Sequence, residues 1–518
     1  MFLGYFVLFS YPLIVAVFFL RLPVRWAIVW SITLGYLFLP SSRNIYIDLP
    51  ILPPFDKVLI PSLAAAVFSW FGIKKRIRIR KSIMSSGGPL LLDRAKNSVE
   101  VLPGFLPRSF FGLLLLALII GGVLMTVQSN KDYLYYGPTV LPGHITRDIF
   151  SEMILLSVVL LPMLLGRKYL FNAAGHRAIL VVFGLSALFY SGLALYEVRM
   201  SPQLNTMLYG FFPHSFLQHM RAGGFRPIVF LDHGLLLGIF FCCSILAVAA
   251  LARVSAGGER LVWLAATFYL FGVLVLSKAL GALVIVICLV PLILFLRVRL
   301  QLIAAAFIAT IALIYPILRG GDVIPTAGLV DIANYISVER AASLEFRFHH
   351  EDVLLEKASE RPLFGWGGWG RYRIFDENGV DRTVSDGEWI ITIGAWGWVG
   401  YLARFGLLCV PLLIFAIQTK RYQVDLVTSG LCLVLAANVI DLIPNSGLTP
   451  LTWMCVGALL GRLEFQRSDA LIAEMENAPN LWENDSIAGT PALRSRLISR
   501  PGQLEYKHSR FPPQHRRR

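Results

Sequence analysis

Long apolar stretches alternate with short polar ones along most of the chain. A helix needs about 17 to 25 apolar residues to cross about 30 Å of hydrocarbon, and such stretches recur up to about residue 460. The pattern predicts an all-α protein, a polytopic membrane helix bundle of about 12 to 13 transmembrane helices. The predicted spans are residues 2–20, 25–40, 58–73, 109–126, 149–166, 178–196, 228–251, 261–277, 279–296, 300–318, 389–417, 425–442 and 449–462.

The first apolar stretch, MFLGYFVLFSYPLIVAVFFL, differs from a removable secretory signal. It has no basic residue at its start and no small-residue cleavage site before Arg21. Secretory signals carry both features. We therefore expect residues 2–20 to form the first span.

Composition supports the membrane interpretation and limits the partners. Of the 518 residues, 56% are hydrophobic and 15% are charged, and the mean hydropathy is +0.66. Soluble proteins carry roughly 25% charged residues. The net charge of +15 is explained by basic loops that set the orientation in the membrane and contact anionic lipid, which is favoured over nucleic-acid binding.

The six cysteines fall inside apolar stretches, without the spacing of metal ligands. They are therefore interpreted as small core residues, and neither a disulfide nor a zinc site is expected. No other metal motif and no cofactor motif is visible. The cysteines are Cys242, Cys243, Cys288, Cys409, Cys432 and Cys455.

Basic residues concentrate in alternate loops, most densely in KKRIRIRK at Lys74–Lys81. Short loops rich in lysine and arginine stay in the cytoplasm, so the alternate set faces outward. The tail ends in RFPPQHRRR, falls on the cytoplasmic side and has too polar a composition to build a core. The predicted organisation is spans 1–10 within 1–318, a long extracytoplasmic loop at 319–388, spans 11–13 within 389–462 and a disordered cytoplasmic tail at 463–518.

The long loop carries charges of both signs: eight Lys and Arg residues, and thirteen Asp and Glu residues. Within it, Glu339 to Arg361 has apolar residues at near-helical spacing and no Gly or Pro before Pro362, which predicts an amphipathic helix along the membrane surface. Arg340, Arg347, His350 and Glu351 fall on neighbouring turns of this helix. Spacing alone favours a solvated face with ion pairs over a binding site.

A turn rich in glycine and tryptophan, PLFGWGGWG, follows from Pro362 to Gly370. Proline ends the helix, and the glycines permit backbone conformations and close approaches that other residues do not. Trp366 and Trp369 suit two roles equally, an aromatic belt at the membrane interface or stacking on a ligand.

Two arginines in or next to the spans, Arg404 and Arg226, need an explanation. Arg404 lies in the middle of a span, where a charge costs several kcal/mol unless it faces a cavity or a counter-charge. Asp441 and the pair Asp232-His233 are the candidate partners, and a structural ion pair is favoured over a substrate contact. Arg226, at the head of its span, suits either a headgroup anchor or a catalytic role.

Several stretches together resemble the signature of the O-antigen ligase and O-antigen polymerase-like family of bacterial surface-polysaccharide proteins. The resemblance rests on RAGGFRPIVF with Arg221 and Arg226, on Ser277-Lys278, where the family often has Ser-Arg, on Arg347, on the turn Pro362–Gly370, and on Asp386-Gly387-Glu388-Trp389 leading to Gly397, Gly400 and Tyr401. It implies a multi-pass protein of the bacterial inner membrane whose long loop is periplasmic. It also implies a metal-independent glycosyltransferase that takes a glycan from a polyprenyl diphosphate and joins it to a hydroxyl of an acceptor glycan.

That chemistry assigns roles to residues of this chain. Arginine can hold phosphate oxygens through two charge-assisted hydrogen bonds, and a general base must lie within about 3 Å of the acceptor hydroxyl. A lipid tail needs an apolar groove between spans. The catalytic candidates are Arg226, Arg347, Asp386, Glu388 and His350, with His349 as a further titratable group. The substrate-binding candidates are Arg221, Lys278, Arg340, Trp366, Trp369 and Trp389.

The sequence is also compatible with other functions. Ligases of the family that act on lipid A core typically have a His-Asn pair where this chain has Asp386-Gly387, which favours a polymerase or an exopolysaccharide-transferring enzyme. A flippase and a chain-length regulator are the expected partners. A lipid-linked glycan transporter is the competing class, although the sequence shows no internal repeat of the kind that transporters usually have. A non-catalytic scaffold is the third class.

Overall fold

The computed structural model describes residues 2–41, 45–47, 53–71, 104–221, 223–419 and 424–477. It divides into two compact units, Met1–Gln466 and Arg467–Arg518. The basic segment at 74–81 and most of the predicted tail lie outside the described residues. The tail begins within a helix, since the last helix continues to Asn477.

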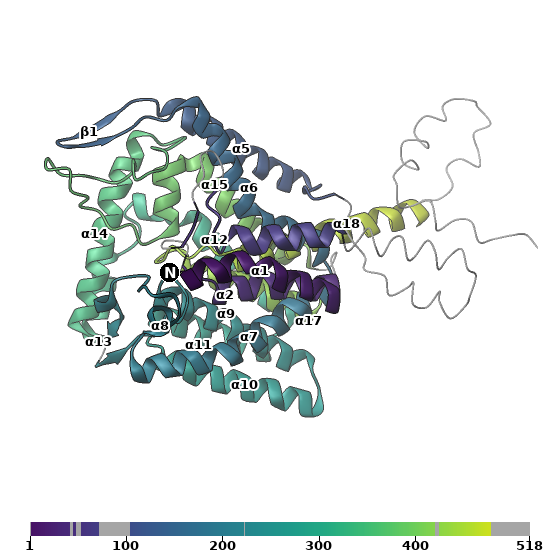
Figure 1. Cartoon of the computed structure of the whole chain (residues 1–518). Coiled ribbons are helices and arrows are strands. Elements are labelled where there is room, and N and C mark those ends of the chain that lie inside the picture. The colour runs from purple at the N-terminus through teal and green to yellow at the C-terminus, as the bar shows by residue number, and fades with distance from the viewer. Residues whose placement is uncertain are drawn as a thin grey trace, which may run out of the picture. The chain divides into compact units, whose positions relative to one another are not determined.

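The all-α prediction is confirmed, because helices make up nearly all the regular structure of the described residues (Figure 1). Each predicted span overlaps a helix. The apolar helices are α1 (Phe2–Arg21), α2 (Val24–Phe38), the helix Leu59–Phe71, α5 (Phe110–Ser129), α6 (Thr146–Tyr169), α7 (Ala173–Met200), α9 (Gly234–Val254), α10 (Gly257–Leu276), α11 (Leu280–Phe295), α12 (Val298–Gly320), α15 (Glu388–Ile417), α17 (Leu426–Asp441) and α18 (Pro450–Asn477).

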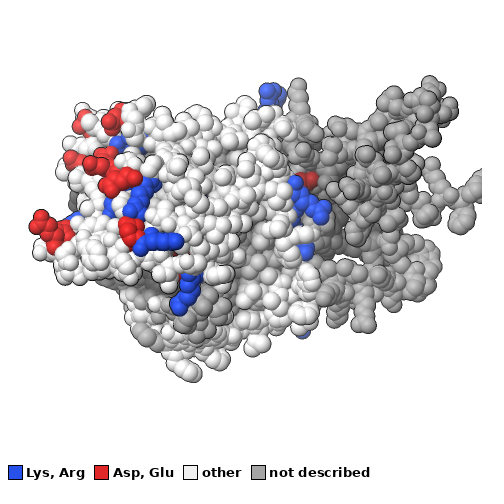
Figure 2. Space-filling model, turned by 90° about the horizontal axis from the view of Figure 1, so that it is seen from above, with Lys and Arg blue, Asp and Glu red and all other residues white. Residues whose placement is uncertain are grey.

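Eight of the helices in the described residues are long and apolar enough to cross a membrane, and shorter apolar helices accompany them. On the face shown in Figure 2, charged side chains gather toward two ends and leave a band without charge between them. A multi-pass membrane protein accounts for both observations, because a charge within hydrocarbon is costly.

The remaining elements connect the apolar helices. They are β1 (Leu134–Tyr136), β2 (Thr139–Leu141), α8 (Leu204–Tyr209), the 3-10 helix η1 (Phe216–His219), β3 (Met220–Arg221), β4 (Gly224–Phe225), α13 (Thr326–Ile336) and α14 (Val338–Glu360). The strands form two antiparallel hairpins, β1–β2 and β3–β4. The labels of β1, α8, α13 and α14 lie at the same end of the bundle, which we name the α14 end (Figure 1).

Helix α14 matches the predicted helix Glu339–Arg361 to within one residue. Its buried residues include Leu354 and Ala358, two of the apolar residues whose near-helical spacing predicted the helix. The hairpins and α13 were not predicted. For the hairpins the reason is that strands of two or three residues leave too short a pattern to detect.

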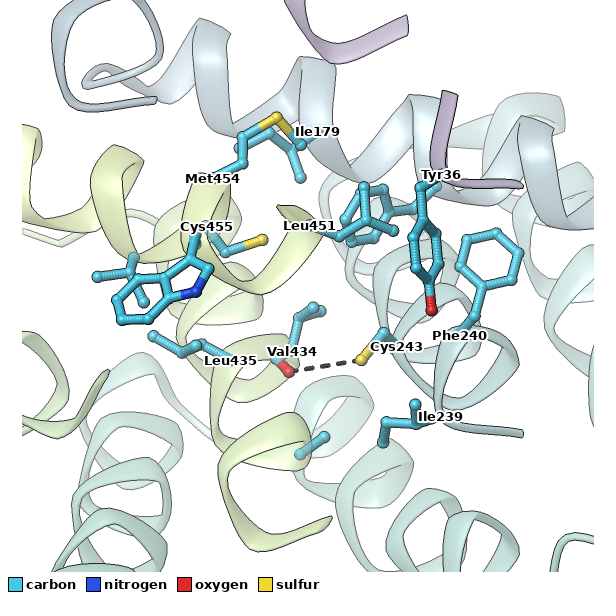
Figure 3. Close-up of a cluster of buried hydrophobic side chains, with 14 of the residues drawn as sticks. Tyr36, Ile179, Ile239, Phe240, Cys243, Val434, Leu435, Leu451, Met454 and Cys455 are labelled. Atoms are coloured by element: carbon cyan, nitrogen blue, oxygen red, sulfur yellow. Dashed lines mark hydrogen bonds between the residues drawn. The ribbon is translucent and has the colours of Figure 1, made fainter. Parts of the chain in front are cut away.

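The core lies where α2, α7, α9, α17 and α18 meet (Figure 3). Apolar side chains fill it, and the thiol of Cys243 donates to the carbonyl of Val434 at 3.8 Å. Five cysteines are buried, as predicted for core residues, whereas Cys288 is exposed on the surface of α11. That part of the cysteine prediction is wrong, because an apolar stretch does not reveal which of its faces meets the lipid.

Candidate functional site

Helix α15 is broken at Gly397, whose φ of 63° and ψ of −168° are not helical. A break removes intrahelical hydrogen bonds, and at membrane depth the freed backbone groups must find other partners. The glycine- and tryptophan-rich turn supplies them. The N–H groups of Trp398 and Val399 donate to the carbonyls of Pro362 and Leu363 at 2.8 and 3.2 Å.

The same turn also donates hydrogen bonds to the other side of the break. The N–H groups of Trp366 and Gly367 bond to the carbonyls of Gly394 and Ala395 at 2.8 and 2.9 Å. Four backbone hydrogen bonds therefore join a loop and a helix that the sequence presents as separate features. This is the close backbone approach that the glycines of the turn were predicted to permit.

Two glycines make this approach possible. A Cβ at Gly397 would collide with the carbonyl of Leu363 and lie 2.5 Å from the nitrogen of Phe364. A Cβ at Gly365 would lie 2.6 Å from the carbonyl carbon and oxygen of Ala395, and the φ of Gly365 is +67°. At both positions a side chain is excluded by contact and by backbone conformation together.

The break brings Glu388 and Arg404 together, with Nη1 of the arginine 3.1 Å from Oε1 of the glutamate. They are sixteen residues apart, which is about 24 Å along a continuous helix, too far for their side chains to meet. The ion pair expected for Arg404 is present. The predicted partners, Asp441 and Asp232-His233, are wrong.

Arg347 and Asp386 form the centre of the candidate site at the α14 end. Nε of Arg347 lies 3.1 Å from Oδ2 of Asp386, and Nη1 donates to the carbonyl of Pro444 at 3.3 Å. Both side chains are partly exposed, by 30% and 39%. One guanidinium thus joins α14, the segment before α15 and the turn after α17, and it remains within reach of solvent.

The segment before α15 is held firmly in place. The N–H of Glu388 bonds to the carbonyls of Leu442 and Asn445 at 3.0 and 3.2 Å. The N-cap of α15 is Gly387, and no side chain caps that end. Asp386 is therefore not a capping residue, and its carboxylate faces Arg347 instead.

His350 lies one helical turn from Arg347 and is partly buried. Burial lowers the pKa of its imidazole, the neighbouring His349 lowers it further, and the charge of Asp386 acts in the opposite direction. A lowered pKa keeps the ring neutral at pH 7, so it can accept a proton. Three of the five predicted catalytic residues, Arg347, His350 and Asp386, are thus neighbours.

Glu388 does not join this group. It is buried and faces Arg404, although only one residue separates it from Asp386. The two carboxylates that the sequence offered as alternative bases therefore occupy different environments.

Two further predicted residues, Arg226 and Lys278, lie together in a second group. Nη2 of Arg226 donates to the backbone carbonyl of Lys278 at 3.1 Å, and the arginine side chain lies against Gly234 at the start of α9. The turn after α17 links this region to the first group. The position that a Cβ on Gly447 would take is 3.5 Å from the side chain of Leu236. Pro444, in the same turn, accepts a hydrogen bond from Arg347.

The tryptophans have three different environments. Trp389 is fully buried, with its ring edge-on to Tyr315 at 5.1 Å, and Trp366 is buried with its indole N–H bonded to the carbonyl of Lys357 at 2.8 Å. Burial favours packing over ligand stacking for both. Trp369 is 55% exposed and stacks on the ring of His144 at 4.8 Å, so one face remains open.

The side chains of Arg221 and Arg340 lie outside the described residues. Glu351, predicted to lie on a solvated face with Arg347, is buried and pairs with Arg319 of α12 at 3.4 Å. Burial raises the pKa of its carboxyl, and Arg319 partly offsets that effect. Arg319 was not predicted, because a basic residue at the end of a span has the pattern of a headgroup anchor.

Among the residues that the structure describes, no group of three or more His, Cys, Asp or Glu has the geometry to hold a metal ion. No protein-family model matches this chain, and a search of curated proteins finds no significant match.

Proposed function

We propose that the chain is a membrane glycosyltransferase that transfers or polymerises glycan units from a polyprenyl-diphosphate carrier. Its place would be the outer face of the bacterial inner membrane, in O-antigen, capsule or exopolysaccharide synthesis. The observation that carries the proposal is the arrangement of Arg347, His350 and Asp386, which places a cation beside two proton acceptors at the end of a membrane bundle.

Each group suits one part of such a reaction. As the glycan leaves, negative charge develops on the diphosphate, and a guanidinium stabilises it through hydrogen bonds to phosphate oxygens. Arg347 is positioned for this by Asp386 and Pro444, and Arg226 is the second candidate. The carboxylate of Asp386 or the neutral imidazole of His350 would accept the proton of the attacking hydroxyl.

A polymerase that extends a lipid-linked glycan is preferred over a ligase that acts on lipid A core. The preference rests on Asp386-Gly387, which stand where the ligases of the resembled family typically have His-Asn. In this scheme the donor is a lipid-linked glycan, the acceptor is a glycan hydroxyl, and a flippase and a chain-length regulator supply and limit the reaction.

One observation favours a second candidate, a lipid-linked glycan transporter. Transporters often have broken helices whose ends meet near the middle of the membrane, and α15 is broken at Gly397. Here the turn Pro362–Gly367 occupies the break through backbone hydrogen bonds, so the freed groups are paired with protein and not directed at a ligand.

The test uses purified full-length protein in nanodiscs with a polyprenyl-diphosphate-linked oligosaccharide. Formation of longer lipid-linked glycans and release of polyprenyl diphosphate are expected. In parallel, protein in liposomes is assayed for movement of the same lipid between leaflets. Movement without joining would replace the proposal with the transporter, and transfer only to lipid A core would replace it with the ligase.

A further inference from the structure

A groove runs between α6 and α15 and is floored by α5, which packs against both helices. Its cavity is about 100 Å³, below the roughly 300 Å³ of sites that enclose a small ligand, so an occupant would keep one side against the surrounding lipid. The lining residues are Ile119, Gly122, Val123, Glu152, Leu155, Leu156, Val159, Trp396, Gly400 and Arg404.

The groove is polar at one end and apolar at the other. Glu152 lies six residues, or about 9 Å, after the start of α6, and Arg404 lies seven residues, or about 10 Å, after the break of α15; both line the polar end of the groove. Leu155, Leu156 and Val159 continue deeper along α6. This gradient matches an amphiphile whose head is near the membrane surface and whose chain points inward.

The polar end holds a carboxylate with no partner among the described side chains. Arg404 pairs with Glu388, whereas Glu152 forms no hydrogen bond or ion pair with any described residue, although it lies within the electrostatic reach of Arg404. An ionisable group at membrane depth that is left without a partner indicates a functional site. A ligand with hydrogen-bond donors would satisfy it.

The turn that closes α15 borders this end of the groove. The position of a Cβ on Gly368 is 3.5 Å from Oε1 of Glu152, and the next residue is Trp369. Trp369 presents an open face, has a φ of +54° and is backed by His144. A flat aromatic face beside an acceptor suits a sugar ring, which has apolar C–H faces and donor hydroxyls.

We propose that this groove is a binding site for a glycosylated lipid phosphate, separate from the group around Arg347. The lipid chain would lie along Leu155, Leu156 and Val159, the phosphate near Arg404, and the sugar between Trp369 and the carboxylate of Glu152. The inference concerns binding alone and does not depend on the proposed transfer reaction. If both hold, the groove is where a lipid-linked acceptor binds.

Photo-crosslinking with full-length protein in nanodiscs tests the inference. The probe is glucosyl farnesyl phosphate with a diazirine on the farnesyl chain, and mass spectrometry maps the labelled peptides. We expect labels in α5, α6 and α15. Glu152→Gln and Trp369→Ala should each lower labelling by about tenfold, because a charge-assisted hydrogen bond or an aromatic contact to the sugar is lost.

The same variants should label normally with farnesyl phosphate, which lacks the sugar. Leu156→Trp should block both probes by filling the groove, whereas Leu185→Trp, on the exposed surface of α7, should block neither. Equal labelling of the wild type and Glu152→Gln by the glycosylated probe would overturn the inference. So would full displacement of that probe by phosphatidylethanolamine.

The result separates this inference from the proposed function. If the labels are confined to α9 and α14 and transfer is intact, binding in the groove is refuted and the proposed transferase function stands. Labels in the groove without any transfer would support the groove and count against the transferase.

Discussion

The carbonyl oxygen of Pro362 accepts a 2.8 Å hydrogen bond from the N–H of Trp398, and so the turn rich in glycine and tryptophan closes the break in helix α15. The two residues are separated by an entire polar segment, yet their backbones pair directly. The turn therefore shapes the membrane helix, and its glycines are explained by that contact.

Gly397→Ala should disrupt this closure. The φ of +63° is unfavourable for alanine and the new Cβ would collide with Leu363, so the cost should be at least the 1 to 3 kcal/mol typical of a strained backbone. We expect a lower midpoint of thermal unfolding in detergent and faster proteolysis of residues 361–387. Gly121→Ala in α5 is the control, because nothing lies within 4 Å of its Cβ position, and it should leave both measurements unchanged. Equal effects of the two variants would refute the role of Gly397.

Asp386→Asn should preserve the amount of folded protein and lower glycan transfer by roughly 10²-fold, the usual size of a general-base contribution. The ion pair with Arg347 is partly exposed, so its loss should cost no more than about 1 kcal/mol of stability. Transfer is measured with the lipid-linked donor in nanodiscs. Asp331→Asn, on the exposed surface of α13, is the control and should be fully active. Normal transfer by Asp386→Asn would place the base elsewhere.

Arg347→Lys should also impair transfer, because lysine keeps the charge and loses the planar fork that engages Asp386 and Pro444 together. We expect at least a tenfold loss of transfer at equal protein level, since the charge-assisted contacts of the fork are worth about 1.5 to 3 kcal/mol. Arg226→Lys should act in the same direction. Arg382→Lys, an exposed ion pair with Asp376, is the matched control. If lysine is tolerated at both 226 and 347, these arginines are headgroup anchors.

The pH dependence of stability should report on His350. Its pKa in the folded protein is lowered from 6.5, so the unfolded chain binds the proton more readily. The stability contributed by the neutral ring is complete above pH about 6.5 and is lost as the pH falls through the folded pKa. As the pH is lowered from 7.5 to 5.5, the midpoint temperature of thermal unfolding should therefore fall less for His350→Gln than for the wild type. An identical fall in both proteins would contradict the assignment.

Orientation can be tested with reporters fused to the chain. The basic loops are predicted to lie in the cytoplasm, so a reporter active only there should work when fused after Arg462 and fail when fused near Gly328 in α13. The reverse pattern would place Arg347 and Asp386 on the cytoplasmic side, where the proposed donor glycan is not displayed.

The apolar pattern predicted where the helices lie because the length of an apolar stretch is a local property of the chain. Helix α14 was predictable for the same reason, since the spacing of Leu354 and Ala358 already marks its buried face. The grouping of Arg347 with His350 followed from helical spacing alone. The proximity of Asp386 was an expectation that rested on a family resemblance.

Only the tertiary structure decided which groups meet. Every residue except proline carries the same backbone N–H and C=O, so nothing in PLFGWGGWG says that it pairs with residues 394–399. In a continuous helix, Glu388 and Arg404 would be about 24 Å apart. They form an ion pair because the break in α15 brings them together, and the sequence does not reveal that break. Glu152 was not predicted as a site residue, because it lies inside an apolar stretch. Its neighbours in space, and not its neighbours along the chain, decide whether a charge in a span faces lipid, protein or a groove.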